Sequence, residues 1–195
     1  MAVTINGYNI VTNKPIIYFY NEDEERDDYL NGSHSGTRGV EIDYRLKTHD
    51  GYITCNYSFY TTDSKKIIPN YEVPYNHTVM LAFPAHMASV VGCVNISKKI
   101  NLYSALLFKG PRYGITGYDD VNGKTFYQKF EPVYTFNLML NLRNVFIKNI
   151  SLSAGVKNLF NANDNIIQPY NGLHAPLPGP SRQYVLKLSY NIPFK

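Results

Sequence analysis

The chain of 195 residues has no tryptophan, only two cysteines and few charged side chains. Charged residues make up 17% of the composition, below the quarter that is usual in soluble globular domains. No apolar run approaches the roughly 18 residues that a membrane-spanning helix requires, which excludes a helical membrane protein. The formal net charge is only +4 and the basic residues are scattered, so nothing indicates a nucleic-acid partner.

Two further features are missing. The first ten residues, MAVTINGYNI, lack the basic and apolar regions of a secretory signal peptide. If the protein is exported, we expect this chain to lack its own beginning. The two cysteines have opposite phases, because Cys55 shares the parity of apolar Ile53 and Cys93 shares that of polar Asn95. We therefore expect free thiols rather than a disulfide.

Aromatic residues and period-two alternation are what the chain does have. It contains 18 tyrosines and 10 phenylalanines, which suit sheet surfaces and the boundary between water and lipid. The segment Arg182–Phe194 is the most regular, with mostly polar odd positions. Its even positions are Tyr184, Leu186, Leu188, Tyr190, Ile192 and Phe194. Because neighbouring strand side chains point to opposite faces, this segment predicts a strand with one apolar face.

The same alternation recurs along the chain and predicts about eight strands, with no helical period. Pro15 interrupts the phase of the first segment, which we expect to form one long or bulged strand. Besides Arg182–Phe194, the predicted strands are Val3–Tyr20, Thr37–Lys47, Gly51–Tyr60, His86–Ile96, Lys99–Lys109, Phe130–Arg143 and Asn149–Lys157.

Short and long connections alternate strictly between these strands. The tight links are Thr48–Asp50, Ser97–Lys98 and Asn144–Lys148. The long links are Asn21–Gly36, Thr61–Ala85, Gly110–Lys129 and Asn158–Ser181. An antiparallel up-and-down barrel has this pattern when one end carries turns and the other carries functional loops. We therefore predict an all-β fold, a portion of an antiparallel up-and-down transmembrane β-barrel with short periplasmic turns and long extracellular loops.

The parity of the residues does not by itself say which face is inside. In a membrane barrel the apolar face meets lipid and the charged face lines the lumen, whereas a soluble ligand-binding barrel reverses this. The asymmetry of the connections and the aromatic residue next to the C-terminus favour the membrane barrel.

Four motifs resemble a known family. Residues 153–161 (SAGVKNLFN) are similar to the G-V-x-N-L-F-D/N signature near the end of TonB-dependent outer-membrane receptors, and residues 175–182 (APLPGPSR) are similar to the P-G-R element before their last strand. Residues 37–41 (TRGVE) and 84–86 (PAH) resemble two motifs at which strands of these barrels start. The matching positions are Gly39, Glu41, Pro84, His86, Asn158, Leu159, Phe160, Pro178, Gly179, Arg182 and Phe194.

The resemblance implies a partial receptor. Complete members are similar to a barrel of about 22 strands whose lumen holds an N-terminal plug domain. Residues 1–195 would then be the C-terminal part of the barrel, about eight strands, without plug or signal peptide. One departure is that Pro180 and Ser181 separate the glycine and the arginine of the P-G-R element.

The resemblance also implies a location and partners. The location would be the bacterial outer membrane, and the role would be import of a scarce nutrient such as an iron–siderophore complex, haem or cobalamin. The partners would be outer-membrane lipid, the nutrient ligand and, through the absent plug, the TonB energy-transducing complex.

Aromatic residues of the long loops are the candidate ligand contacts. Tyr113, Tyr118, Tyr127 and Tyr170, together with Phe126, could stack on a planar ligand. They could equally form an interfacial girdle or pack the loops together.

We expect no metal, cofactor or catalytic residue. The acidic stretch Glu22–Asp28 lacks the spacing of a calcium loop and reads as a solvated loop. The glycine-rich segment Gly110–Gly117 lacks the pattern of a phosphate-binding loop. The five histidines show no ligand spacing; they are His34, His49, His77, His86 and His174. The chain is therefore not expected to be an enzyme.

Two other architectures stay open. One is a self-closing outer-membrane barrel of eight strands with a structural or adhesive role, which fits the strand count. The other is a soluble lipocalin-like barrel that binds a ligand with its apolar face inward.

Overall fold

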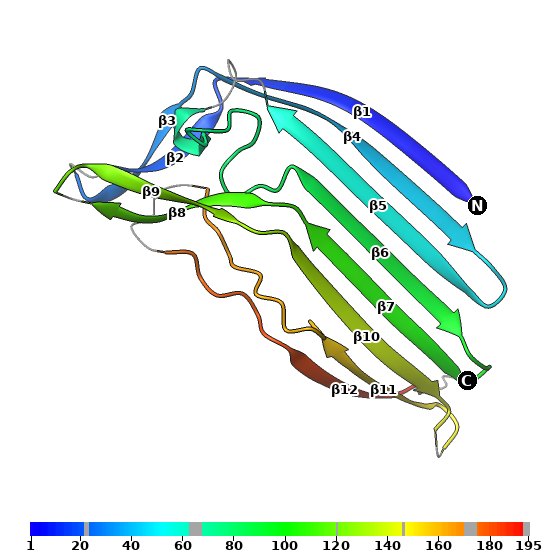
Figure 1. Cartoon of the computed structure of the whole chain (residues 1–195). Coiled ribbons are helices and arrows are strands. Elements are labelled where there is room, and N and C mark those ends of the chain that lie inside the picture. The colour runs from blue at the N-terminus through cyan, green and yellow to red at the C-terminus, as the bar shows by residue number, and fades with distance from the viewer. Residues whose placement is uncertain (22–23, 63–67, 120, 146, 170–174, 193–195) are drawn as a thin grey trace.

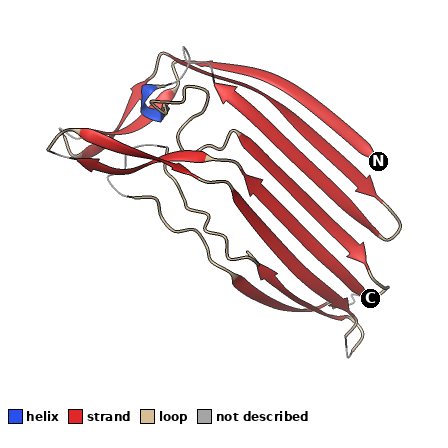
Figure 2. Cartoon of the chain, in the orientation of Figure 1, coloured by secondary structure: helices blue, strands red, loops and turns tan. Residues whose placement is uncertain are grey.

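A computed structural model of the protein describes residues 1–21, 24–62, 68–119, 121–145, 147–169 and 175–192. Eight antiparallel strands form one sheet, which Figures 1 and 2 show as a row of neighbouring arrows. In their order across the sheet they are β1 (Ala2–Asn13), β4 (His34–Lys47), β5 (Gly51–Thr62), β6 (His86–Asn95), β7 (Ile100–Lys109), β10 (Val133–Arg143), β11 (Ile150–Lys157) and β12 (Gln183–Tyr190).

The structure confirms the eight predicted strands and corrects two of them. The segment 3–20 is not one strand, because the chain turns at Lys14, which has a φ of 49°, and Pro15. Phe130 does not belong to β10, which begins after Pro132 at Val133. Proline has no backbone N–H to donate to a ladder, so strands break beside it.

Two of the predicted long loops contain strand pairs of their own. The hairpin of β2 (Ile16–Asn21) and β3 (Arg26–Asn31) connects β1 to β4, and the hairpin of β8 (Arg112–Asp119) and β9 (Lys124–Phe130) connects β7 to β10. The connection between β5 and β6 holds one short 3-10 helix, η2 (Pro69–Tyr71). In the described ranges, no helix has the length and hydrophobicity that crossing a membrane would require.

The connections are sorted between the two ends of the sheet, as predicted. The links between β4 and β5, β6 and β7, and β10 and β11 lie at one end, together with the N-terminus (Figure 1). Both hairpins and the long β5–β6 and β11–β12 connections lie at the opposite end, which we call the loop end. We call the end with the short links and the N-terminus the turn end. Within the described residues the sheet is open, since β1 and β12 are its two outer strands.

The register gives the sheet one apolar and one polar face. Ile42 of β4 stands opposite Tyr57 of β5, which stands opposite Ala88 of β6. The adjacent row on the other face joins Asp43 to Asn56 and Asn56 to Ser89. Antiparallel register preserves parity across the whole sheet, so the alternation of each strand adds up to two continuous surfaces.

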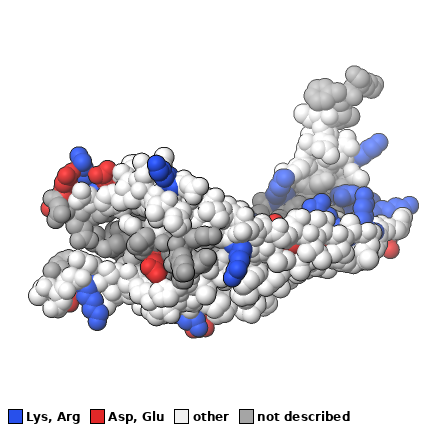
Figure 3. All heavy atoms as spheres, turned by 90° about the horizontal axis from the view of Figure 1, so that it is seen from above, with Lys and Arg blue, Asp and Glu red and all other residues white. Residues whose placement is uncertain are grey.

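The polar face is the hollowed one. Figure 3 shows lysine and arginine side chains gathered in the hollow of the molecule at the turn end. The apolar face is exposed, with Leu186 and Leu188 retaining 75% and 71% of their accessible surface. This settles the parity question in the direction that a membrane barrel requires, because a soluble binding barrel would turn its apolar face inward.

Buried apolar side chains lie outside the large sheet in the part of the chain that the structure describes. They are Ile17, Ile68, Val73, Val79, Leu81 and Ile115, which belong to the loop-end hairpins and the β5–β6 connection. A soluble sheet protein would instead bury one face of its main sheet. The buried apolar side chains of the described residues therefore stabilise the loop end rather than the large sheet, which we also call the wall.

The two cysteines are free and lie on opposite faces, as their phases predicted. Cys55 stands opposite Tyr44 and Val90 on the apolar face. Cys93 stands opposite Tyr52 and Tyr103 on the polar face. The sheet itself separates the two thiols.

Gly39 is expected to be sensitive to substitution. A Cβ at this position of β4 would overlap the carbonyl oxygen of Phe59 and the ring of Tyr8. We predict that Gly39→Ala lowers the free energy of unfolding by about 1–3 kcal/mol, because the neighbouring strands must move apart. The measurement is thermal unfolding of the protein in detergent, followed by heat-modifiable gel migration.

Gly7 of the paired strand β1 provides the matched control, since nothing lies within 4 Å of a Cβ placed there. Gly7→Ala is expected to be neutral or slightly stabilising. Equal losses for the two variants would contradict the close approach at Gly39.

Candidate functional site

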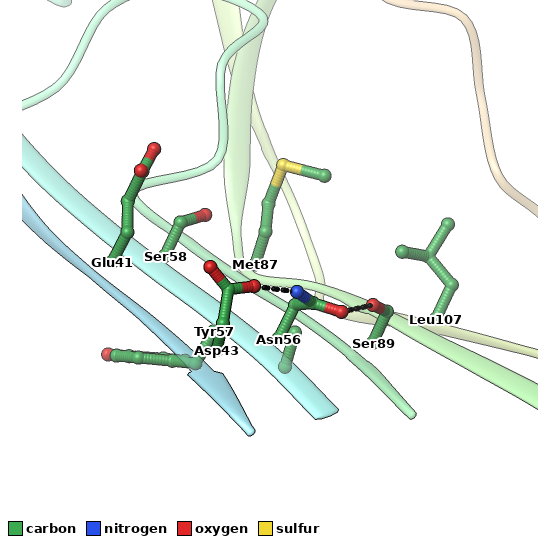
Figure 4. A pocket seen from close by; sticks show the side chains of 9 residues that line it. Glu41, Asp43, Asn56, Tyr57, Ser58, Met87, Ser89 and Leu107 are labelled. Atoms are coloured by element: carbon green, nitrogen blue, oxygen red, sulfur yellow. Dashed lines mark hydrogen bonds between the residues drawn. The ribbon is translucent and has the colours of Figure 1, made fainter. Parts of the chain in front are cut away.

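The middle of the polar face forms a shallow pocket of about 290 Å³. Figure 4 shows Glu41, Asp43, Asn56, Ser58, Met87 and Ser89 among the side chains that line it. The amide of Asn56 donates a hydrogen bond to the carboxylate of Asp43, and the hydroxyl of Ser89 donates to the Asn56 side-chain oxygen at 3.4 Å. The pocket is thus polar and acidic, and it lies on the concave side.

The turn-end half of the same face carries the opposite charge. Four exposed cations project from its strands: Arg45, Lys47, Arg143 and Lys187. Among them, Asn141 donates to the side-chain oxygen of buried Asn101 at 2.8 Å. Charged and amide side chains on a concave face are suited to an aqueous or protein-filled lumen.

A small apolar cluster holds the loop end together. Val73, Val79 and Leu81 of the β5–β6 connection pack with Ile115 of β8. Tyr113 and Tyr127 cover this cluster, and the ring of Tyr75 meets that of Tyr113 edge-on at 5.6 Å. Two long segments far apart in sequence therefore share one core, which gives the loops a fixed shape.

The predicted loop aromatics are only partly brought together. Tyr113 and Tyr127 lie side by side on the cluster, whereas Tyr118 and Phe126 lie further along the β8–β9 hairpin. Tyr170 falls outside the described residues. The packing role that the sequence left open is present for Tyr113 and Tyr127. A ligand role for these tyrosines stays a prediction.

Two phenols of this cluster have a raised pKa. Burial raises the pKa of Tyr127, with a smaller contribution from Glu72, and burial raises the pKa of exposed Tyr75, with a smaller contribution from Tyr113. Both phenols are protonated at physiological pH, as ordinary phenols are, and can donate hydrogen bonds. The loop end thus presents an aromatic surface with the Glu72 carboxylate nearby.

The histidines in the described ranges do not assemble into a metal site. Within those ranges no group of three or more potential ligands gathers. His77 pairs with Glu72 at 2.5 Å, and His86 bonds the Tyr57 hydroxyl at 2.8 Å while its ring lies over Phe59. His86 also begins β6 after Pro84, which is the strand start that the motif predicted. His174 is outside the described residues.

The other motif residues close the long β11–β12 connection. Asn158 is buried with a φ of 50°, and its side-chain amide donates to the carbonyl oxygens of Ala162 and Pro180. Its side-chain oxygen accepts from the Ala162 N–H at 2.8 Å. The backbone N–H of Leu159 donates to the Phe136 oxygen. One asparagine thus ties together both ends of the connection.

Neighbouring motif positions complete this closure. Phe160 stacks on Phe136 with ring centroids 5.8 Å apart, and the Asn161 side chain accepts from the Arg182 N–H at 2.9 Å. Gly179, after Pro178, leaves no room for a side chain against the carbonyl oxygen of Asp164. Of the remaining positions, Gly39 and Glu41 lie inside β4 rather than at its start, and Phe194 is outside the described residues.

Solved structures with the same fold are known. No protein-family model and no curated protein matches this sequence. The ferripyoverdine receptor of the outer membrane of Pseudomonas aeruginosa is 13% identical with a TM-score of 0.69, and the match covers 96% of this chain and 24% of that one. The siderophore receptor PirA from Acinetobacter baumannii is 14% identical with a TM-score of 0.69, covering 96% and 29%. The chain has the fold of part of a TonB-dependent receptor barrel.

This agreement confirms the resemblance and the fold predicted from the motifs. A third match is the ferric-catecholate import receptor Fiu from E. coli K12, which is 16% identical with a TM-score of 0.67 and covers 96% of this chain. The chain spans about a quarter of the length of these proteins, from 24% to 29%. Its polar face corresponds to a barrel interior, and its apolar face to the outer wall.

One group of residues was missed at the sequence level. Lys109 at the end of β7, Arg112 at the start of β8 and Asp164 of the β11–β12 connection form an ion cluster. Asp164 is 52 residues from Arg112 in the chain, and no local pattern links positions so far apart. The only sign of this ion cluster in the sequence is that two basic residues, Lys109 and Arg112, flank Gly110 and Pro111.

Asn158 provides a test of the loop closure. We predict that Asn158→Ala lowers the free energy of unfolding by about 2–3 kcal/mol, because it removes three hydrogen bonds and places alanine in a left-handed conformation. Thermal unfolding of the protein in detergent measures the loss.

Exposed Asn163 of the same connection is the control, and Asn163→Ala should change the free energy of unfolding by less than about 0.5 kcal/mol. A stability loss for Asn158→Ala no larger than this control would contradict the closing role.

Proposed function

We propose that this chain is the C-terminal part of the barrel of a TonB-dependent outer-membrane receptor, which captures and imports a scarce nutrient. The observation that carries the proposal is the open, curved sheet with an exposed apolar outer face and a charged concave face. The match of 96% of the chain to outer-membrane receptors supports it. The role is capture and transport, and no covalent chemistry is assigned to the segment.

The two free strand edges support a larger barrel. In lipid, each unpaired backbone amide costs several kcal/mol, so β1 and β12 need further strands beside them. Closure of these eight strands on themselves would leave a narrow interior for Glu41, Asp43 and the four turn-end cations. A barrel built from a chain about four times as long would be wider, and water or protein in its lumen could pair with these charges.

We further propose that the ligand is an iron–siderophore complex. The ferripyoverdine receptor, PirA and Fiu are described as receptors for iron or siderophore ligands. The tyrosine surface around Tyr75, Tyr113 and Tyr127 offers aromatic rings for a planar chelating group at the loop end. Haem and cobalamin are the alternative ligands for the proposed receptor.

The orientation of the two faces is tested with the native cysteines. A nitroxide on Cys55, in a Cys93→Ser variant, should collide more with oxygen, which concentrates in lipid, than with a polar nickel chelate. A nitroxide on Cys93, in a Cys55→Ser variant, should show the reverse preference. If the protein were a soluble binding barrel, it would be free of lipid and the Cys55 label would lie in its interior.

The receptor assignment is tested by mass and by uptake. An antibody against the C-terminal peptide should detect an outer-membrane species several-fold heavier than 22.3 kDa, because the chain covers about a quarter of its neighbours. Deleting the gene should abolish uptake of at least one ferric siderophore in iron-limited cells.

Other outcomes would redirect the assignment. A membrane species near 22.3 kDa would instead favour the self-closing small barrel. The same mass in the soluble fraction would contradict the membrane location. Uptake of haem or cobalamin alone would leave the receptor in place and overturn the siderophore assignment.

A further inference from the structure

Two cations converge on one carboxylate at the loop end of the polar face. Lys109 Nζ lies 2.6 Å from Asp164 Oδ2, and Arg112 Nη2 lies 2.9 Å from Asp164 Oδ1. Lys109 is the last residue of β7, and Arg112 begins the hairpin that follows it. Asp164 comes from the β11–β12 connection, so the pair of bonds fastens that connection to the wall of the sheet.

The cluster is buried and incompletely satisfied. The side chain of Arg112 is 7% exposed and that of Asp164 is 17% exposed. Arg112 Nη1 donates to the carbonyl oxygen of Asn165 at 3.0 Å, but Arg112 Nε is buried and has no hydrogen-bond partner. A buried donor without an acceptor is unfavourable, and the cluster also holds one positive charge in excess.

The geometry explains why Asp164 leaves this donor unpaired. A carboxylate that faces a guanidinium side-on satisfies Nε and one Nη with its two oxygens. Here the two oxygens of Asp164 are divided between Lys109 and Arg112 Nη2. A tetrahedral oxyanion has at least one acceptor more than a carboxylate and can reach all three donors together.

We propose that Lys109 and Arg112 form a binding site for a phosphate-type oxyanion, and that Asp164 is its displaceable occupant. While Asp164 fills the site, the β11–β12 connection is held against the β7–β8 corner. An incoming oxyanion takes Lys109 Nζ, Arg112 Nη2 and the Nε donor, and it releases the Asp164 side chain, while Arg112 Nη1 keeps its bond to the carbonyl oxygen of Asn165. The base stays closed, because Asn158 and the backbone pairing of Ile166 with Leu177 do not involve the cations.

Inorganic phosphate is the probe for this site, and import is not needed to observe it. On the full-length protein in detergent, phosphate should speed hydrogen exchange at residues 163–165 by about tenfold, relative to chloride at equal ionic strength. Exchange at Ala162 and Ile166, whose N–H groups bond Asn158 and Leu177, should stay unchanged. Unchanged or slower exchange at residues 163–165 would overturn the proposal.

Removing the resident carboxylate gives an independent measurement. Asp164→Asn should bind phosphate about tenfold more tightly than the native protein in calorimetry, because the site is no longer occupied. Adding Lys109→Met to Asp164→Asn should abolish this gain. Asp119→Asn, which alters an exposed turn of the β8–β9 hairpin, should leave phosphate affinity unchanged and serves as the matched control.

These variants also separate an oxyanion site from a merely structural ion pair. If Asp164→Asn loosens the connection but gains no phosphate affinity, the cluster is a permanent fastening and the proposal fails. If Asp119→Asn gains as much affinity as Asp164→Asn, binding is unspecific and the proposal fails as well. Failure on either ground leaves the receptor function untouched, since neither measurement depends on transport.

Discussion

The antiparallel hydrogen-bond ladder is the interaction on which the rest of this structure depends. It runs without interruption across eight strands and preserves side-chain parity from β1 to β12. Because parity is kept, apolar and polar residues that alternate along each strand become two separate surfaces. Those surfaces can meet lipid on one side and water or protein on the other. Within the described residues the ladder ends at two open edges, β1 and β12.

The wall and the loops are stabilised differently. The wall has no apolar core of its own among the described residues, so its stability comes from backbone pairing and from what surrounds it. The loop end has the opposite character, with a compact cluster around Val73 and Leu81 and a connection closed by Asn158. Rigid loops on a rigid wall are a suitable frame for binding, since less conformational entropy is lost when a ligand is captured.

Charged side chains follow a fixed order along the concave face, from the loop end to the turn end. Along β4, Glu41 and Asp43 come before Arg45 and Lys47 on the way to the turn end, where Arg143 ends β10, and Lys187 lies on the same face of β12. The ion cluster of Lys109, Arg112 and Asp164 lies at the loop end, where the wall meets the loops. Along this face, the aromatic rings of the loop end are therefore followed by an ion cluster, then by carboxylates and finally by cations.

The sequence by itself determined the eight strands of the large sheet, their faces and the alternation of short and long connections. These follow from period-two patterns and from local turn residues, which need no knowledge of distant parts of the chain. It also located Asn158, Gly179 and Arg182 through their motifs, although it did not reveal that they close one connection. Pro15 was visible as a break in phase, but neither the β2–β3 hairpin that follows it nor the β8–β9 hairpin that precedes Pro132 was predicted.

Only the tertiary structure decided which face is concave, and only it joined Asp164 to Lys109 and Arg112. Curvature arises from the twist of all eight strands together, and no single strand records it. The ion cluster joins three segments whose proximity depends on where β11 lies in the sheet and on how its connection folds back. Long-range contacts of this kind follow from register and packing, and an isolated sequence pattern does not contain them.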